Sequence, residues 1–167
     1  MKQQVTFLFV LSCISAVIGF WIFASHSSSS FGYESVLIIL KPDAVRQYVE
    51  ADIYTILTAR GHVVLQKEAI YNPPPQELLE RHYQEHRGRS FYDSLLEFMK
   101  SGPIVVSVWK GPPGSIQVVR DLVGPTDPIK AAPDTIRGKF GTSAQANAIH
   151  ASDSPKSASR EISIWFE

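Results

Sequence analysis

Three short runs typical of β-strands constrain the fold of this chain more than any other feature. They are SVLIIL (35–40), HVVLQKEAIY (62–71) and IVVSVW (104–109). The first run is fully apolar and rich in β-branched residues, as a buried strand is, and the third is a similar apolar run. The second run is a further strand, which ends at the break NPPP. Longer segments with helical spacing of apolar residues separate them. We therefore expect an α+β domain in which a small sheet is backed by helices.

Five stretches place their apolar residues three and four positions apart, as a helix with one buried face requires. The last of them has the clearest start, with Ser154 as N-cap and Pro155 at the first helical position. Between residues 124 and 145 no periodicity is visible, and we expect a long loop, which in a compact domain is often functional. The expected helices cover residues 49–60, 76–86, 90–101, 114–123 and the stretch from 155 onward.

The first 30 residues differ in composition from the rest. No charged residue lies between Lys2 and Glu34, and residues 5–24 are mostly apolar. About 20 such residues can span a bilayer as a helix, and this exceeds the roughly 7–15 apolar residues of a usual cleaved signal. The serine-rich stretch at 25–30 is typical of a flexible spacer. We expect an anchor or signal segment with its spacer at 1–30 and one folded domain at 31–167.

This N-terminal pattern predicts a location in the cell. A membrane anchor through residues 5–24 fits the apolar length best, with the domain held at a membrane or in the secretory pathway. Cleavage after Ala24 is the alternative, and so is a mitochondrial or cytoplasm-facing placement. The net formal charge is +0, so nothing in the overall charge favours nucleic acid as a partner.

Several familiar sites are excluded by their motifs. Neither of the standard glycine-rich phosphate loops is present, nor is the zinc motif H-E-x-x-H. The single cysteine, Cys13, lies in the apolar N-terminal run, so a disulfide framework is impossible. In HYQEH, His82 and His86 have the four-residue spacing of metal ligands. No third ligand accompanies them, and we interpret both as histidines on a helix surface.

Isolated cations follow the ends of several expected elements. Arg and Lys are the side chains that bind phosphate oxygens, although each alone is as readily a solvated surface charge. Tyr83 and Phe91 are close to them in sequence, so a nucleotide with a stacked base and a clamped polyphosphate is conceivable. The cations are Lys41, Arg89, Arg120 and Arg137.

His150 stands just before the last expected helix. A nucleophilic histidine needs one ring nitrogen with a free lone pair and an acceptor for the N–H of the other. Glu161 in the following helix could supply that acceptor, and Ser152 a nearby hydroxyl. These residues alone leave open whether His150 is a nucleophile or an ordinary loop histidine.

Six motifs in one order resemble nucleoside diphosphate kinases, and the resemblance runs from about Glu34 to Phe166. It implies a ferredoxin-like βαββαβ sandwich, an antiparallel sheet backed by helices, assembled as a homo-oligomer, either hexamer or tetramer. It also implies transfer of the terminal phosphate of ATP to a nucleoside diphosphate by a ping-pong route through a phosphohistidine, with Mg²⁺ as cofactor. The motifs are LKPDAV (40–45), RHYQEHRGRSFY (81–92), MKSGPIVVSVWKG (99–111), VGPTDP (123–128), APDTIRGKFG (132–141) and NAIHASDS (147–154).

The resemblance also assigns roles to residues. His150 matches the nucleophile, Glu161 the carboxylate that orients its ring, and Ser152 the hydroxyl beside them. The phosphate-binding positions match Lys41, Arg120, Thr126 and Arg137. The positions around the base and sugar match Phe91 for stacking, Tyr83 near the histidine and Asn147 for the sugar. No protein ligand for Mg²⁺ is implied, since the nucleotide phosphates hold the ion.

Three positions depart from the family pattern. Ala151 follows the histidine where glycine is usual, which matters if that position needs a positive φ. Pro125 replaces an acidic residue, and the prolines of 72–75 form a small insertion. Together with the unusual N-terminus, these departures leave an alternative: a non-catalytic nucleotide-binding or scaffold member held at a membrane.

Overall fold

The structure is a computed structural model that describes residues 32–59 and 61–167. The predicted anchor at 5–24 and the spacer at 25–30 lie outside these residues. Within the described ranges, every helix is too short or too polar to cross a bilayer. The boundary between residues 30 and 31 stays a prediction.

The four strands form a single antiparallel sheet with the order β2-β3-β1-β4. This order confirms the expected α+β fold of the ferredoxin-like βαββαβ type, with α3 and α4 added between β2 and β3 and α7 added after β4. The elements in chain order are β1 (Glu34–Leu40), α1 (Pro42–Arg46), α2 (Glu50–Thr58), β2 (Val64–Tyr71), α3 (Gln76–His82), the 3-10 helix η1 (Gln84–His86), α4 (Tyr92–Lys100), β3 (Ile104–Gly111), α5 (Ser115–Val123), the 3-10 helix η2 (Pro128–Lys130), α6 (Ile136–Phe140), β4 (Ile149–Ala151) and α7 (Pro155–Phe166).

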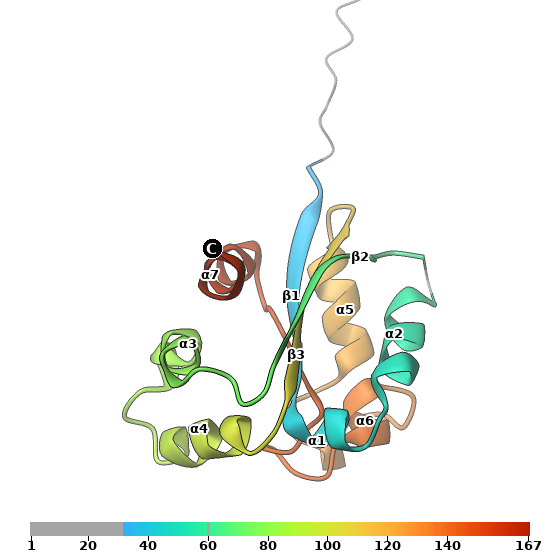
Figure 1. The fold of residues 1–167 in the computed structure, drawn as a ribbon. Coiled ribbons are helices and arrows are strands. Elements are labelled where there is room, and N and C mark those ends of the chain that lie inside the picture. The colour runs from blue at the N-terminus through green and yellow to red at the C-terminus, as the bar shows by residue number, and fades with distance from the viewer. Residues whose placement is uncertain (1–31, 60) are drawn as a thin grey trace, which may run out of the picture. The chain divides into compact units, whose positions relative to one another are not determined.

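Strand β1 lies in the middle of the sheet, and its apolar residues serve both faces. Alternate side chains point to opposite sides of a strand, so Ile38 and Leu40 join one core and Leu37 and Ile39 the other. Helices α2 and α5 cover the first face, and α3, α4 and α7 cover the second (Figure 1). A strand covered on both faces has no polar side, which is why SVLIIL shows no alternation.

The expected elements differ from the observed ones where the elements are short. The helix expected at 76–86 ends at His82 and continues as η1, and the expected loop at 124–145 contains η2 and α6. Arg137 therefore lies on a helix rather than in a loop. Helices of three and five residues complete only about one to one and a half turns, so no periodicity reveals them. Thr135 does supply a local start signal, since its side chain accepts a hydrogen bond from Gly138 N at 3.1 Å.

Candidate active site

His150 lies in β4, a three-residue strand paired with β1 so that His150 stands opposite Ile39. Its neighbour Ala151 is extended and pairs with Ile38. Among the described residues other than glycine, only Tyr48 and Ala148 have a positive φ. The position after the histidine therefore does not require glycine, and the methyl group of Ala151 adds no backbone strain.

The turn that leads into β4 is strained. Ala148 has a φ of 66°, and Ile149 N donates to Asn147 O at 2.8 Å across it. A three-residue turn of this kind with positive φ is rare and costs free energy. Asp43, in the first turn of α1, holds it in place by accepting from Ala148 N at 2.9 Å. The turn gives Asn147 and His150 their positions in the same cleft.

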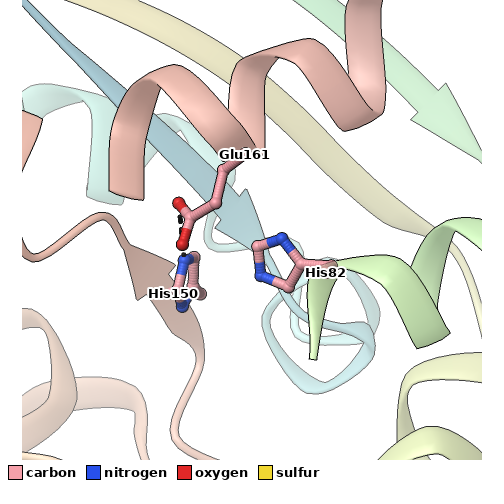
Figure 2. Close-up of side chains that lie close together, drawn as sticks. All are labelled: His82, His150 and Glu161. Atoms are coloured by element: carbon pink, nitrogen blue, oxygen red, sulfur yellow. Dashed lines mark hydrogen bonds and ion pairs between the residues drawn. The ribbon is translucent and has the colours of Figure 1, made fainter. Parts of the chain in front are cut away.

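A buried carboxylate fixes one nitrogen of the His150 ring. Nε2 of His150 lies 3.1 Å from Oε2 of Glu161, which is 3% exposed on α7. Ser152 Oγ donates to the same oxygen at 2.6 Å, and Arg160 Nη2 lies 3.7 Å from Oε1. An ionised carboxylate can only accept, so Nε2 carries the proton and the lone pair is on Nδ1. Nδ1 points away from Glu161 (Figure 2).

The cleft in front of His150 has a volume of about 470 Å³. Two of its lining side chains are cations, and none is a carboxylate, so an anionic ligand suits it. The lining residues are Lys41, Tyr83, His86, Phe91, Leu95, Thr126, Arg137, Ala144, Gln145, Asn147 and His150.

Lys41 is the more deeply placed of the two cations. Its Nζ donates to Asn147 Oδ1 at 2.7 Å and to Gln145 O at 3.2 Å. Burial is the main cause that lowers the pKa of Lys41 to about 8; the charge of Arg137 lowers it further, and Asp43 opposes the change. A phosphate group would relieve this penalty, because it would supply the missing negative charge.

Arg137 is held by two backbone carbonyls. Its Nη1 donates to Gly124 O at 3.0 Å and its Nη2 to Ile149 O at 2.9 Å. Burial and then the nearby Arg120 lower the pKa of Arg137 to about 10. The guanidinium is therefore fixed in orientation, and no carboxylate of the described residues forms an ion pair with it, as suits an arginine that binds an anion.

Aromatic rings form one side of the cleft. Phe91 is 47% exposed, which leaves its ring available for a stacking partner. The rings of His86 and Phe91 have centroids 5.4 Å apart, and His86 stacks on Tyr83 at 6.2 Å. Tyr83 is buried, and burial raises the pKa of its phenol. The predicted surface histidine His86 is thus part of the cleft wall.

The structure brings together nine of the ten site residues named from the sequence. Glu161 and Ser152 lie behind His150, and the other members line the cleft, except Arg120. Arg120 borders a separate hollow on α5 that also includes Pro125. Both polar atoms of the Asn147 side chain form hydrogen bonds within the protein. Nδ2 donates to Thr126 O at 2.9 Å, and Oδ1 accepts from Lys41 Nζ. Nothing in the structure explains Pro125.

The prediction of a position on the helix surface is wrong for His82. The residue is 2% exposed, and its Nδ1 accepts from Trp165 Nε1 at 3.2 Å. Leu79 of α3 and Tyr83, the residue that follows this helix, are also buried. This stripe of apolar neighbours was the signal in the sequence that His82 faces inward.

His82, His150 and Glu161 place one potential ligand atom each within 4.8 Å of one another. The hydrogen bond from Trp165 occupies the lone pair on His82 Nδ1, and a neutral imidazole then carries its proton on Nε2. Neither nitrogen of His82 is left to bind a metal, and Glu161 already accepts from His150 and Ser152. The cluster suits proton and charge positioning better than metal binding.

An oriented imidazole facing unneutralised cations is what phosphoryl transfer through a histidine requires. Fold and site together define the class as phosphotransferases of the ferredoxin-like fold. The family model for nucleoside diphosphate kinase matches residues 34–167. The chain belongs to the nucleoside diphosphate kinase family.

Individual relatives agree with this assignment. A nucleoside diphosphate kinase of Chloroflexus aggregans is 45% identical over 135 residues, which is 80% of this chain and 87% of that protein. One of Streptomyces avermitilis is 46% identical over 134 residues, 80% of this chain and 96% of the relative. The crystal structure of the Aquifex aeolicus nucleoside diphosphate kinase superposes with a TM-score of 0.76 at 40% identity, covering 81% of this chain and 96% of that one.

Proposed function

We propose that this nucleoside diphosphate kinase moves the terminal phosphate of ATP to a nucleoside diphosphate in two steps through His150. One observation carries the proposal: Glu161 binds Nε2 of the ring and leaves the lone pair on Nδ1, on the side away from the carboxylate. In the first step Nδ1 forms a bond to the γ-phosphorus, and the bond from that phosphorus to the β-phosphate oxygen breaks. In the second step an acceptor diphosphate takes the phosphoryl group from Nδ1.

The other residues of the site divide between charge and position. Positive charge develops on the ring as Nδ1 attacks, and Glu161 stabilises it while Ser152 fixes the carboxylate. Lys41 and Arg137 neutralise phosphate oxygens. Thr126 supports them in the cleft, and Arg120 adds positive charge from the neighbouring hollow. The present contacts of Lys41 and Arg137, to a neutral amide and to carbonyls, leave both charges available.

The nucleoside end of the substrate occupies the aromatic side of the cleft. We expect the base to stack on Phe91, with Tyr83 filling the space beside His150. Stacking reads no base edge, so one site can accept different nucleotides. Asn147 contacts the sugar, and since its amide also holds Lys41 we expect it to position that lysine.

Mg²⁺ enters this scheme with the nucleotide. Mg²⁺ binds carboxylates, phosphates and water, and no carboxylate lines the cleft. We therefore expect the substrates to be magnesium complexes of ATP and the diphosphate, in which the ion offsets part of the phosphate charge. Lys41 and Arg137 neutralise the remainder.

The direct test is to incubate the full chain with ATP labelled on the γ-phosphate. We expect an acid-labile label on the protein that a nucleoside diphosphate removes as labelled triphosphate, and no label on His150→Ala. That variant should still bind ADP, which shows that it is folded, and His62→Ala, outside the site, should label normally. Labelling of His150→Ala at the wild-type rate would overturn the proposal.

We also propose that the chain forms a homo-oligomer, a hexamer or a tetramer. Support comes from β2, an edge strand of eight residues whose side chains are mostly exposed. Three of these, Val64, Leu65 and Ile70, are large and apolar. An edge strand with unpaired backbone groups and apolar side chains is suited to pair with a second copy.

For the N-terminus we propose that residues 5–24 anchor the catalytic domain to a membrane. The proposal rests on the length and apolar character of this segment. The measurement is the N-terminal residue of the protein isolated from cells. Met1 supports an uncleaved anchor, and a start at Ser25 or later would replace it with a removed signal.

A further inference from the structure

His82 is a buried histidine beside the nucleophile, and the proposed mechanism gives it no role. It ends α3 and is only 2% exposed. Its ring lies against that of His150, with centroids 4.6 Å apart and an angle of 81° between the planes. Burial lowers the pKa of His82 well below its ordinary value, so the ring is neutral at pH 7. A buried neutral imidazole in this place needs an explanation.

The indole of Trp165 selects the tautomer of this ring. Trp165 Nε1 can only donate, and it donates to His82 Nδ1 at 3.2 Å. The proton of the neutral ring is therefore on Nε2. Among the described residues Nε2 has no conventional hydrogen-bond partner, although it is fully buried. A donor left in this state costs free energy unless some other group receives it.

The ring of His150 is that group. Figure 2 shows an edge of the His82 ring, with Nε2 on it, turned toward the side of the His150 ring. Trp165 binds the other nitrogen, Nδ1. An N–H directed at an aromatic face is a weak hydrogen bond. The near-perpendicular planes and the short centroid distance fit this contact.

Glu161 alone does not fix the His150 ring. Its hydrogen bond holds Nε2 at 3.1 Å, but a ring held at one nitrogen can still rock and swing Nδ1 away from its line of attack. A second contact on the face of the ring removes this freedom. Phosphoryl transfer depends on alignment of the attacking atom, so the two contacts together define the direction of the Nδ1 lone pair.

We propose that His82 is a positioning residue for the nucleophile: Trp165 locks it in the Nε2–H tautomer, and that N–H holds the plane of the His150 ring. This inference rests on the proposed role of His150 and adds the second of the two contacts that orient it. His82 itself does not touch the nucleotide, and it is not among the residues that line the cleft.

Three substitutions of His82 distinguish the N–H contact with the His150 ring from a role in packing alone. His82→Gln has an amide N–H at the end of a side chain long enough to reach His150. His82→Asn keeps an acceptor for Trp165, but its amide is one methylene shorter and stops short of His150. His82→Phe keeps only a ring.

The readouts are the rate of His150 phosphorylation at saturating ATP and the dissociation constant for ADP, both measured on the full chain. We expect the phosphorylation rate to be about tenfold to a hundredfold lower than in the wild type for His82→Phe and His82→Asn. In His82→Gln it should be close to the wild-type rate. The affinity for ADP should be unchanged in all three variants.

Tautomers are read directly from the ¹⁵N shifts of labelled histidine side chains. We expect His82 in the wild type to carry its proton on Nε2, and Trp165→Phe to mix the two tautomers and to slow phosphorylation. A matched control is His62→Phe, which removes a histidine outside the site.

Two results would overturn the proposal: a wild-type His82 with its proton on Nδ1, or equal phosphorylation rates in His82→Phe and His82→Gln. The free energy of unfolding of each variant is measured as well. If the phosphorylation rate of the three variants falls in proportion to their stability, His82 acts only through packing, and the proposal is also wrong. If the wild type carried no phosphate on His150, the proposed function would fail instead, while the tautomer measurement would still decide whether Trp165 locks His82.

Discussion

Lys41 is a buried cation whose charge depends on what the cleft contains. In the free protein burial lowers its pKa to about 8, so at pH 8 roughly half of the molecules carry a neutral amine. A bound phosphate stabilises the charged form and raises this pKa. Binding of the magnesium complex of ADP at pH 8 should therefore take up protons. Calorimetry in buffers of different ionisation enthalpy measures this uptake.

The control for this prediction is Lys41→Arg. An arginine stays protonated at pH 8, so its binding enthalpy should not depend on the buffer. A wild-type enthalpy that is equally independent of the buffer would contradict the prediction, since it would show that Lys41 does not meet the phosphates.

For single residues, the sequence predicted which side chains lie together in the site, but not which atoms of these side chains form the hydrogen bonds. The resemblance named His150, Glu161 and Lys41, and the structure brings all three to one place. Residue types do not reveal which nitrogen of His150 is bonded, because this depends on the geometry between β4 and α7. His82 was misinterpreted for a similar reason: its partner Trp165 is 83 residues away in the chain.

Among the elements, the first turn of α1 and the turn before β4 stabilise each other. Asp43 Oδ2 accepts from Ala148 N at the strained position, and its charge raises the pKa of Lys41. Asp43→Ala leaves a buried N–H unpaired, which should lower the free energy of unfolding by about 1–3 kcal/mol. Chemical denaturation measures this loss.

Asp43→Asn is the matched variant, because its side-chain oxygen can still accept from Ala148. We expect it to lose less stability than Asp43→Ala, and to weaken ADP binding at pH 8 because the pKa of Lys41 falls without the carboxylate. Equal stability losses in the two variants would show that the hydrogen bond to Ala148 is not what holds the turn.

The elements that the sequence missed are those that position the site. Strand β4 has three residues and α6 five, too few for a periodic pattern. They exist because of contacts made far along the chain, such as the pairing of β4 with β1. The long strands and helices, by contrast, carry their own pattern and were predicted within a few residues.

For the whole molecule, the two edges of the sheet differ. The β4 edge is short and carries His150, whereas β2 presents eight residues with a mostly exposed surface. The sequence predicts β2 as a strand, and the single chain leaves its apolar residues Val64, Leu65 and Ile70 at the surface. A second copy paired along β2 would bury them.

This pairing predicts the effect of a charge placed on the edge. Ile70 is 67% exposed on β2, so Ile70→Lys should leave the isolated domain folded while it repels a second copy along the strand. Light scattering after size exclusion should show the wild type as an oligomer and Ile70→Lys as smaller species at the same concentration. Gln84→Lys, which adds the same charge at an exposed position of η1, should keep the wild-type mass. If Ile70→Lys keeps it too, the copies associate through another face, and the apolar side chains of β2 need a different partner.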